Sequence, residues 1–270
     1  MRRNLQGKRI LITGASRGLG KALAEDAARR GAHLALAARS VAPLEALAAQ
    51  LRETGGDAVP IPADLTSRDD RRRLLDTVRD RLGGLDVLLN NAGVGSFGHF
   101  AESTDTILRQ VMELNFFAQA ELMRAAIPLL AEGRQPAIVN ISSMCGRRGL
   151  PAWPEYSASK FAFAGLSEAV RGELVRYGIS VLLVLPGLTQ TSLSTNMLRN
   201  EGRMAINFTG GMRPEYVATR ILNALERNRR ELVLGREAIW MLRVNRLWPW
   251  LVDRLMKRKV RQLYAAELAS

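Results

Sequence analysis

The chain alternates short apolar runs with longer segments in which apolar residues recur every three or four positions. The first pattern is typical of buried β-strands and the second of amphipathic helices. Residues 181–185 are continuously apolar, as expected for a strand that helices cover on both faces. The alternation predicts a doubly wound parallel α/β sheet of about seven strands with helices on both faces. We place the strands near residues 9–13, 33–38, 57–62, 86–90, 136–141, 179–185 and 231–234.

A glycine-rich turn joins the first predicted strand to the first helix. Gly14, Gly18 and Gly20 follow the spacing G-x-x-x-G-x-G between the apolar run and a helical segment at 21–30. Glycine lets the backbone turn tightly and approach a pyrophosphate, whose charge is stabilised at a helix N-terminus. This context predicts a dinucleotide site. The alternative is an ordinary strand-to-helix turn.

The end of the second predicted strand indicates which dinucleotide binds. NAD-binding proteins place an Asp or Glu there to hydrogen-bond the ribose 2′-OH. Here Arg39 and Ser40 occupy the place, and the nearest following acid, Glu45, lies in the next helix. Arg39, together with Arg17 of the glycine turn, suits a 2′-phosphate. We therefore predict NADP rather than NAD.

A possible proton relay lies further along the chain. Tyr156 and Lys160 are four residues apart in a predicted helix and so share one face, and Ser143 precedes the tyrosine by 13 positions. An ammonium group there favours the phenolate and is expected to lower the pKa of Tyr156 below its usual value of about 10. A phenol with a lowered pKa can exchange a proton with a carbonyl or alcohol oxygen.

Taken together, these motifs resemble the short-chain dehydrogenase/reductase family. Residues 13–20 resemble its TGxxxGxG turn and residues 90–93 its NNAG segment. The resemblance implies a Rossmann-type fold and a catalytic tetrad of Asn115, Ser143, Tyr156 and Lys160. It extends the expected cofactor site to Gly14, Ser16, Arg17, Gly18, Leu19, Gly20, Arg39, Ser40, Asp64, Leu65, Asn91, Ala92, Gly93, Tyr156, Lys160, Pro186, Gly187, Thr189 and Thr191.

The family's roles follow the chemistry of the side chains. Tyr156 would transfer the proton, Ser143 would hydrogen-bond the substrate oxygen, and Lys160 would lower the tyrosine pKa and bind the nicotinamide ribose. Asn115 would position a water beside Lys160; the alternative is a polar group that kinks a buried helix. The resemblance also implies a homodimer or homotetramer, built on helices near 104–131 and 156–176.

The expected substrate is a lipophilic ketone or secondary alcohol of the steroid, fatty-acyl or a similar class, with reduction favoured. In this family a segment equivalent to residues 188–212 forms a lid over the substrate, and here it is rich in Met and Leu. The predicted substrate contacts are Ser143, Cys145, Trp153, Tyr156 and Leu193. Two alternatives stay open: a non-catalytic NADP-binding scaffold or redox sensor, and a 3-oxoacyl-carrier-protein reductase.

Composition narrows the remaining classes. The chain has 270 residues, 47% of them hydrophobic, and a net charge of +13, but its arginines are scattered and match no nucleic-acid motif. A single cysteine, Cys145, fits a reducing compartment, and the two histidines make no metal-ligand constellation. We expect no metal, no nucleic acid, no signal peptide and no spanning helix, and a cytoplasmic location.

The last segment departs from the rest of the chain. We divide the sequence into a domain at 1–235 and an extension at 236–270, which holds three of the four tryptophans: Trp240, Trp248 and Trp250. Between residues 236 and 261 eight residues are basic and two are acidic, and Pro249 is expected to split the segment into two helices. This composition suits peripheral contact with a membrane interface. The alternative, which we favour, is a tail packed on the cleft or on a second subunit.

Overall fold

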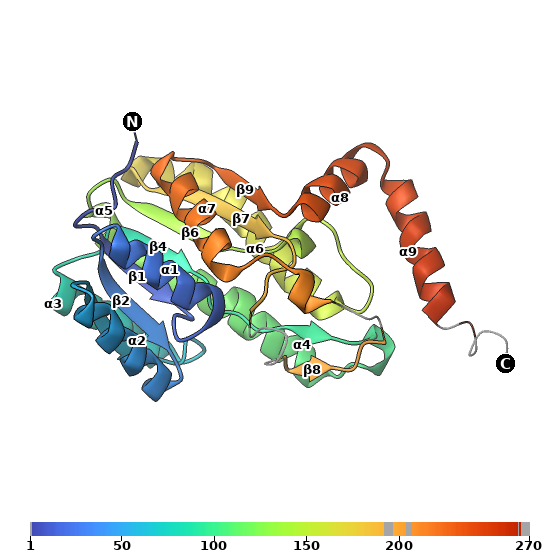
Figure 1. The fold of residues 1–270 in the computed structure, drawn as a ribbon, viewed down its shortest axis with the longest axis horizontal. Helices are drawn as coiled ribbons and strands as arrows, with labels where there is room; N and C mark the ends of the chain where they lie inside the picture. Colours follow the sequence, from blue (N-terminus) through green and yellow to red (C-terminus); the bar gives the residue numbers. More distant parts are fainter. Residues whose placement is uncertain (1, 192–196, 204–206, 264, 266–270) are drawn as a thin grey trace.

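The centre of the molecule is one parallel sheet of seven strands in the order β3-β2-β1-β4-β6-β7-β9 (Figure 1). The computed structural model describes residues 2–191, 197–203, 207–263 and 265. The predicted Rossmann-type α/β fold is confirmed, and each predicted strand lies within one residue of its expected ends. The strands are β1 (Arg9–Thr13), β2 (His33–Ala38), β3 (Asp57–Pro62), β4 (Val87–Asn90), β6 (Ala137–Ile141), β7 (Ser180–Pro186) and β9 (Glu231–Leu234).

Helices cover both faces of the sheet and bury two separate apolar clusters. One cluster contains Leu23, Leu44 and Ile221 from helices α1 (Gly18–Arg29), α2 (Val41–Glu53) and α7 (Pro214–Glu226). The other packs against helices α3 (Arg68–Leu82), α5 (Ala118–Ala131) and α6 (Pro154–Glu173). Strands covered in this way must be apolar on both sides, which explains their continuous hydrophobic runs.

The long helix expected near 104–131 is interrupted. Helix α4 (Asp105–Met112) and α5 are joined by a π-helical turn at Glu113–Phe117. Two short strands that the sequence pattern did not predict, β5 (Ser96–Phe97) and β8 (Arg199–Asn200), pair beside the cleft. Two residues are too short a run to show a period.

Arg3 closes the sheet on the side opposite the cleft. Its guanidinium donates to the carbonyl oxygens of Leu225 at 2.8 Å and Gln135 at 3.0 Å and to Ser180 Oγ at 2.8 Å. Only 4% of the residue is exposed. A buried charged group is tolerated when its own N–H groups are hydrogen-bonded. Through these hydrogen bonds Arg3 connects the end of α7 to the starts of β6 and β7.

The extension forms two helices, α8 (Arg236–Leu247) and α9 (Pro249–Leu263), which break at the proline as predicted. They project from the body beyond the sheet (Figure 1). Their attachment is local: a Cβ on Gly187 would lie 3.0 Å from that of Ala238, and Arg148 donates to Asn245 Oδ1 at 3.0 Å and pairs with Asp253. Among the described helices, none is long and apolar enough to cross a membrane.

Candidate active site

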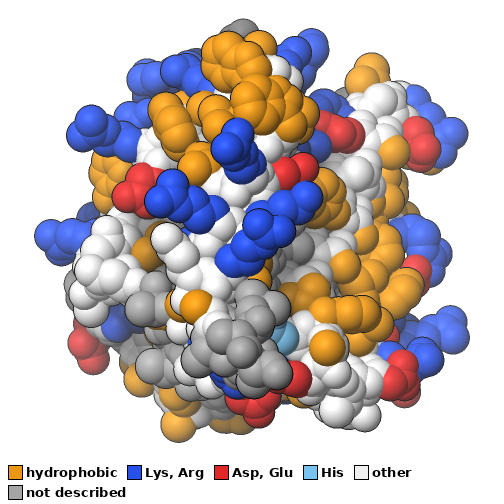
Figure 2. Space-filling model, turned by 90° about the vertical axis from the view of Figure 1, so that its right-hand side faces the viewer, with side chains coloured by type: hydrophobic (Ala, Val, Ile, Leu, Met, Phe, Trp, Pro, Cys, Tyr) orange, Lys and Arg blue, Asp and Glu red, His pale blue; other side chains and the backbone are white. Residues whose placement is uncertain are grey.

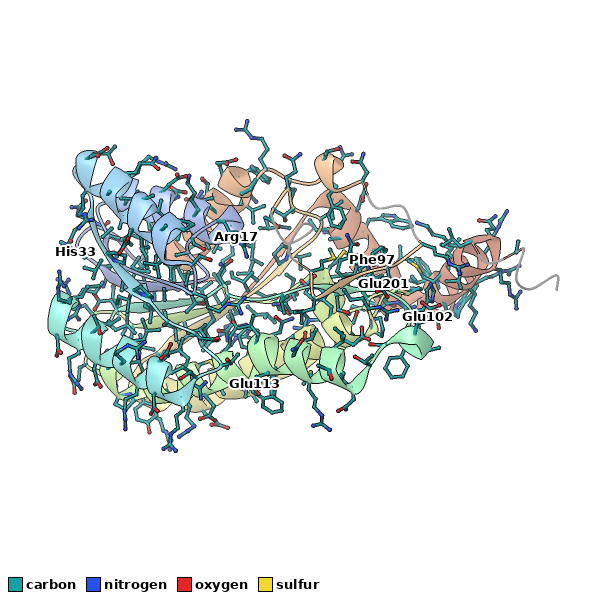
Figure 3. All side chains as sticks on the ribbon, turned by 90° about the horizontal axis from the view of Figure 1, so that it is seen from below. Arg17, His33, Phe97, Glu102, Glu113 and Glu201 are labelled. Carbon is teal, nitrogen blue, oxygen red and sulfur yellow. The ribbon has the colours of Figure 1, made fainter. Side chains whose placement is uncertain are left out.

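A cleft of about 1050 Å³ runs along the carboxyl ends of the strands, from the start of α1 to the two tail helices. This is the place where open parallel sheets bind ligands. Figure 3 shows Arg17 beside α1, at one end of this arrangement, and Phe97 further toward the tail. Every predicted cofactor residue lines the cleft, as do Ser143, Cys145 and Trp153. Asn115 lies behind its wall, and Leu193 falls outside the described residues.

The glycine turn has the shape that a pyrophosphate requires. Gly14 and Gly18 have φ values of +64° and +54°, and a Cβ on Gly20 would lie 2.1 Å from the carbonyl oxygen of Gly14. Asn91 Nδ2 supports the turn by donating to the carbonyls of Thr13 at 2.9 Å and Gly14 at 3.2 Å. The backbone therefore passes where any side chain would intrude, and the start of α1 faces the cleft. These residues fit a dinucleotide.

Thr13 is a supporting residue that sequence analysis did not single out. Its hydroxyl accepts hydrogen bonds from the backbone N–H groups of Asn91 at 3.0 Å and Ala92 at 3.1 Å and donates to the carbonyl of Leu89 at 3.3 Å. It fixes the loop after β4 against the glycine turn. The first position of the TGxxxGxG pattern was the available signal.

The far end of the cleft carries cations after β2 and a carboxylate after β3. Arg39 and Ser40 line the wall directly after β2, and Arg17 of the glycine turn lines the same cleft. Asp64 is held by its own turn, because its carboxylate accepts from Thr66 N at 3.0 Å and Thr66 Oγ1 at 2.8 Å. Among the described residues that line the cleft, none at the end of β2 is acidic.

Tyr156 and Lys160 lie side by side on α6, both almost fully buried. Lys160 Nζ donates to the carbonyl of Ile141 at 3.0 Å and lies 5.7 Å from the centroid of the tyrosine ring. Ser143 follows β6 and its Oγ accepts from the N–H of Cys145 at 3.2 Å. The strand end and the helix thus bring a hydroxyl, a phenol and an amine to one wall.

The expected lowering of the tyrosine pKa is wrong for this structure. Burial raises the pKa of Tyr156 above its usual value, and the hydrogen bond with Ser143 offsets only part of that rise. Burial also lowers the pKa of Lys160 to about 8. Both shifts follow from desolvation, which disfavours the charged form of each group. The spacing of Tyr156 and Lys160 in the sequence overestimated how far the ammonium group lowers the tyrosine pKa. Spacing carries no information about burial.

Asn115 occupies the π-helical turn between α4 and α5 and is fully buried. Its side-chain oxygen accepts from Val94 N at 2.8 Å, and its Nδ2 donates to Val94 O at 2.9 Å and Ser159 Oγ at 3.1 Å. It therefore holds the loop after β4 to α6, at a helix irregularity as the alternative interpretation expected. Its role in positioning a water stays a prediction.

Next to Tyr156 the cleft borders an aromatic and apolar cluster. The ring centroids of Phe97 and Trp153 are 5.0 Å apart, and those of Trp153 and Tyr156 are 5.4 Å apart. Cys145 packs in the same cluster, where burial raises the pKa of its thiol to about 11. Phe208 of the predicted lid also packs there.

Sequence analysis missed several lining residues from the carboxyl-terminal part of the chain. They are Tyr216 and Arg220 of α7 and Arg236, Ile239, Met241, Met256 and Lys259 of α8 and α9. The apolar positions interleaved with basic ones in the extension were the only signal. They predicted a helix with an apolar face and left open whether the cleft, a second subunit or a membrane would cover it.

Comparison with known proteins agrees with this geometry. The family model for short chain dehydrogenase matches residues 8–202. The chain belongs to the short-chain dehydrogenase/reductase family. It is therefore an oxidoreductase of that family, and the Ser, Tyr and Lys of the predicted tetrad line one cleft.

Two curated relatives of this family member are similar over nearly its whole length. The ketoacyl reductase HetN of Nostoc is 32% identical over 94% of this chain and 89% of that protein. The 11-beta-hydroxysteroid dehydrogenase A of Sesamum indicum is 33% identical over 97% of this chain and 77% of that protein.

Two solved family structures superpose on the chain. A Burkholderia phymatum family member in complex with NAD gives a TM-score of 0.84 at 25% identity, covering 92% of this chain and 96% of that one. A Burkholderia cenocepacia family member in complex with NADP gives 0.79 at 27% identity, covering 94% of this chain and 99% of that one.

Proposed function

We propose that the protein uses NADPH to reduce a lipophilic ketone to a secondary alcohol. The observation that carries this proposal is the burial of Ser143, Tyr156 and Lys160 on one wall of a cleft that also holds the glycine turn. A structural role alone does not require a phenol, a hydroxyl and an amine to meet at a ligand-sized cavity.

The residues divide the chemistry of a reduction between them. When bound, the nicotinamide would supply a hydride to the carbonyl carbon. Tyr156 would donate its phenolic proton to the carbonyl oxygen, and Ser143 would stabilise the charge that builds on that oxygen. The raised pKa of Tyr156 keeps the phenol protonated at neutral pH. The tyrosine is therefore in the protonated form that a reduction requires.

The preference for NADP rests on Arg17 and Arg39. Both line the adenosine end of the cleft, where guanidinium groups suit a 2′-phosphate. One of the similar structures is a complex with NAD and the other a complex with NADP. The family fold alone therefore does not determine which dinucleotide binds. The absence of an acid after β2 among the described residues supports the same choice.

The lipophilic substrate is proposed from the cleft wall. Leu150, Trp153 and Phe208 line it, with Phe97 packed behind Trp153, and Ile239 and Met256 of the tail add further apolar surface. A sequestered apolar wall binds apolar substrate surface because burial removes both from water. The relatives' names, a ketoacyl reductase and a hydroxysteroid dehydrogenase, suit such substrates.

A 3-oxoacyl-carrier-protein reductase is the second candidate, and the name of the Nostoc relative favours it. Against it, helices α8 and α9 line the cleft and limit the approach of a carrier protein. A 3-oxoacyl thioester presented on a carrier protein and on a small thiol distinguishes the two. Faster turnover of the carrier-bound form would favour this alternative.

The test is consumption of NADPH with a panel of steroid, fatty-acyl and aromatic ketones, each paired with a small polar ketone. We expect turnover with the apolar ketones and a lower KM as their apolar surface grows. Tight NADPH binding with no turnover on any ketone would instead support a non-catalytic scaffold or sensor.

We further propose that the protein is a homodimer or homotetramer built on α5 and α6. Phe161 is 44% exposed on α6, and Phe117, which directly precedes α5, is 49% exposed. Large apolar residues on neighbouring helices are typical of subunit contacts. Light scattering at micromolar concentration should give a multiple of 29.8 kDa.

A further inference from the structure

Helices α8 and α9 and the turn between them expose large apolar side chains that neither the fold nor the cleft uses. Five residues form what we term the tail apex: Trp240, Leu247, Trp248, Trp250 and Leu255. Their exposed fractions are 61%, 65%, 51%, 61% and 47%. A single exposed apolar residue needs no explanation, but a group on one projecting helix pair indicates an interaction surface.

Basic side chains surround the tail apex. Figure 2 looks at the molecule from the tail side and shows apolar side chains gathered at the top with Lys and Arg around them. The exposed arginines of α8 and α9 outside the cleft include Arg243, Arg246, Arg254 and Arg258. Of the two acids in residues 236–261, Asp253 is paired with Arg148. The surface therefore presents indole rings inside a ring of positive charge.

The inner faces of both helices are already engaged. Ala238, Val244 and Val252 are buried, and Met256 and Lys259 line the cleft. The apolar residues of the apex lie on the outside and are not needed to hold the helices in place. One face of the two helices therefore packs on the body while the other face exposes the tail apex, so packing of the tail and a surface interaction can occur together.

We propose that the tail apex docks on the surface of a bilayer containing anionic lipids, with its indoles in the headgroup region. Trp side chains favour that region, and basic side chains beside them are attracted to anionic headgroups. A second copy of the chain fits this surface less well. A two-fold contact would place the same cluster of basic side chains against itself.

Vesicle flotation of the full chain tests the proposal. We expect binding to phosphatidylcholine vesicles that contain phosphatidylglycerol, weaker binding without it, and partial release in high salt. A triple variant carries Trp240→Ser, Trp248→Ser and Trp250→Ser. Each indole lost should weaken vesicle binding by on the order of tenfold. Their matched control is Phe100→Ser, an aromatic residue 66% exposed outside the tail, which should bind as the unaltered protein does.

The charge component has its own matched pair. One variant combines four substitutions on the tail: Arg243→Gln, Arg246→Gln, Arg254→Gln and Arg258→Gln. Each charge removed should reduce vesicle binding by about fivefold. The same four changes on α3, at Arg68, Arg72, Arg79 and Arg81, remove equal charge from a helix far from the tail and should have little effect. Equal loss from both sets would mean unspecific attraction and would overturn the proposal.

Tryptophan fluorescence gives a second readout in the same samples. Trp153 is already buried, so a blue shift on adding vesicles reports the three tail indoles. No shift and no flotation, in protein that still binds NADPH, would refute membrane docking. A fall in oligomer mass on replacing the indoles would instead assign the apex to a subunit contact.

Discussion

At its cofactor end the cleft is formed by the turns that follow β1, β2, β3 and β4, whereas its substrate end is formed by side chains from elements far apart in the sequence. The first end uses backbone shape, which a glycine turn and a few hydrogen bonds define. The second brings Trp153 and Phe208 together with helices after residue 235. Local turns repeat across a family, while a surface gathered from distant elements can change independently.

This comparison predicts that changes at one end leave the other intact, with Tyr156 between them. Tyr156→Phe should lower kcat by about 10²- to 10⁴-fold, since the ring remains but its transferable proton is lost. The Kd for NADPH should stay within twofold. Stopped-flow turnover and fluorescence titration measure the two quantities, and a variant that kept half the normal rate would remove Tyr156 from the mechanism.

The next largest effect is expected at the cofactor end alone. Arg39→Asp should lower the ratio of kcat/KM for NADPH to that for NADH by about 10- to 150-fold, the value of a charge-assisted hydrogen bond. The KM for the ketone should not change. Arg29→Asp is the control, because that arginine is exposed and does not line the cleft. An unchanged ratio would show that Arg39 does not contact the cofactor.

The pH dependence tests the boundary between the two ends. Because burial raises the pKa of Tyr156, phenolate is scarce near neutral pH, and oxidation of the alcohol should quicken by about tenfold per pH unit. Reduction needs the protonated phenol and should stay level until Lys160 loses its charge near its pKa of about 8, then decline. Both directions can be followed by NADPH absorbance; oxidation that is already level at neutral pH would contradict the raised pKa.

The smallest effect is expected where the tail is tied to the body. Asp253→Asn removes the ion pair with Arg148 and should raise the ketone KM by about 1.5- to 5-fold, as exposed ion pairs are weak. NADPH binding should not change. Asp105→Asn breaks an exposed pair with Arg109 on α4 and serves as the control. An altered Kd for NADPH would mean that the two ends are coupled.

The sheet, the glycine turn and the meeting of Ser143 with Tyr156 and Lys160 could be predicted because each depends on residues close in sequence or at the ends of parallel strands. The raised pKa of Tyr156 could not, since it depends on burial by Phe97, Trp153 and Cys145. The π-helical turn at residues 113–117 could not be predicted, because its sequence has the same helical character as the helices on either side. The position of the tail depends on contacts that no local pattern records.

Arg3 sets a condition on the order in which the molecule is assembled during translation. Its carbonyl partner on Leu225 lies 222 residues further along the chain. At typical elongation rates that partner leaves the ribosome about 10 to 45 seconds later. Until then the Arg3 guanidinium lacks its native hydrogen-bond partner. The glycine turn can therefore form early in the nascent chain, while the contacts of Arg3 on the opposite side of the sheet form last.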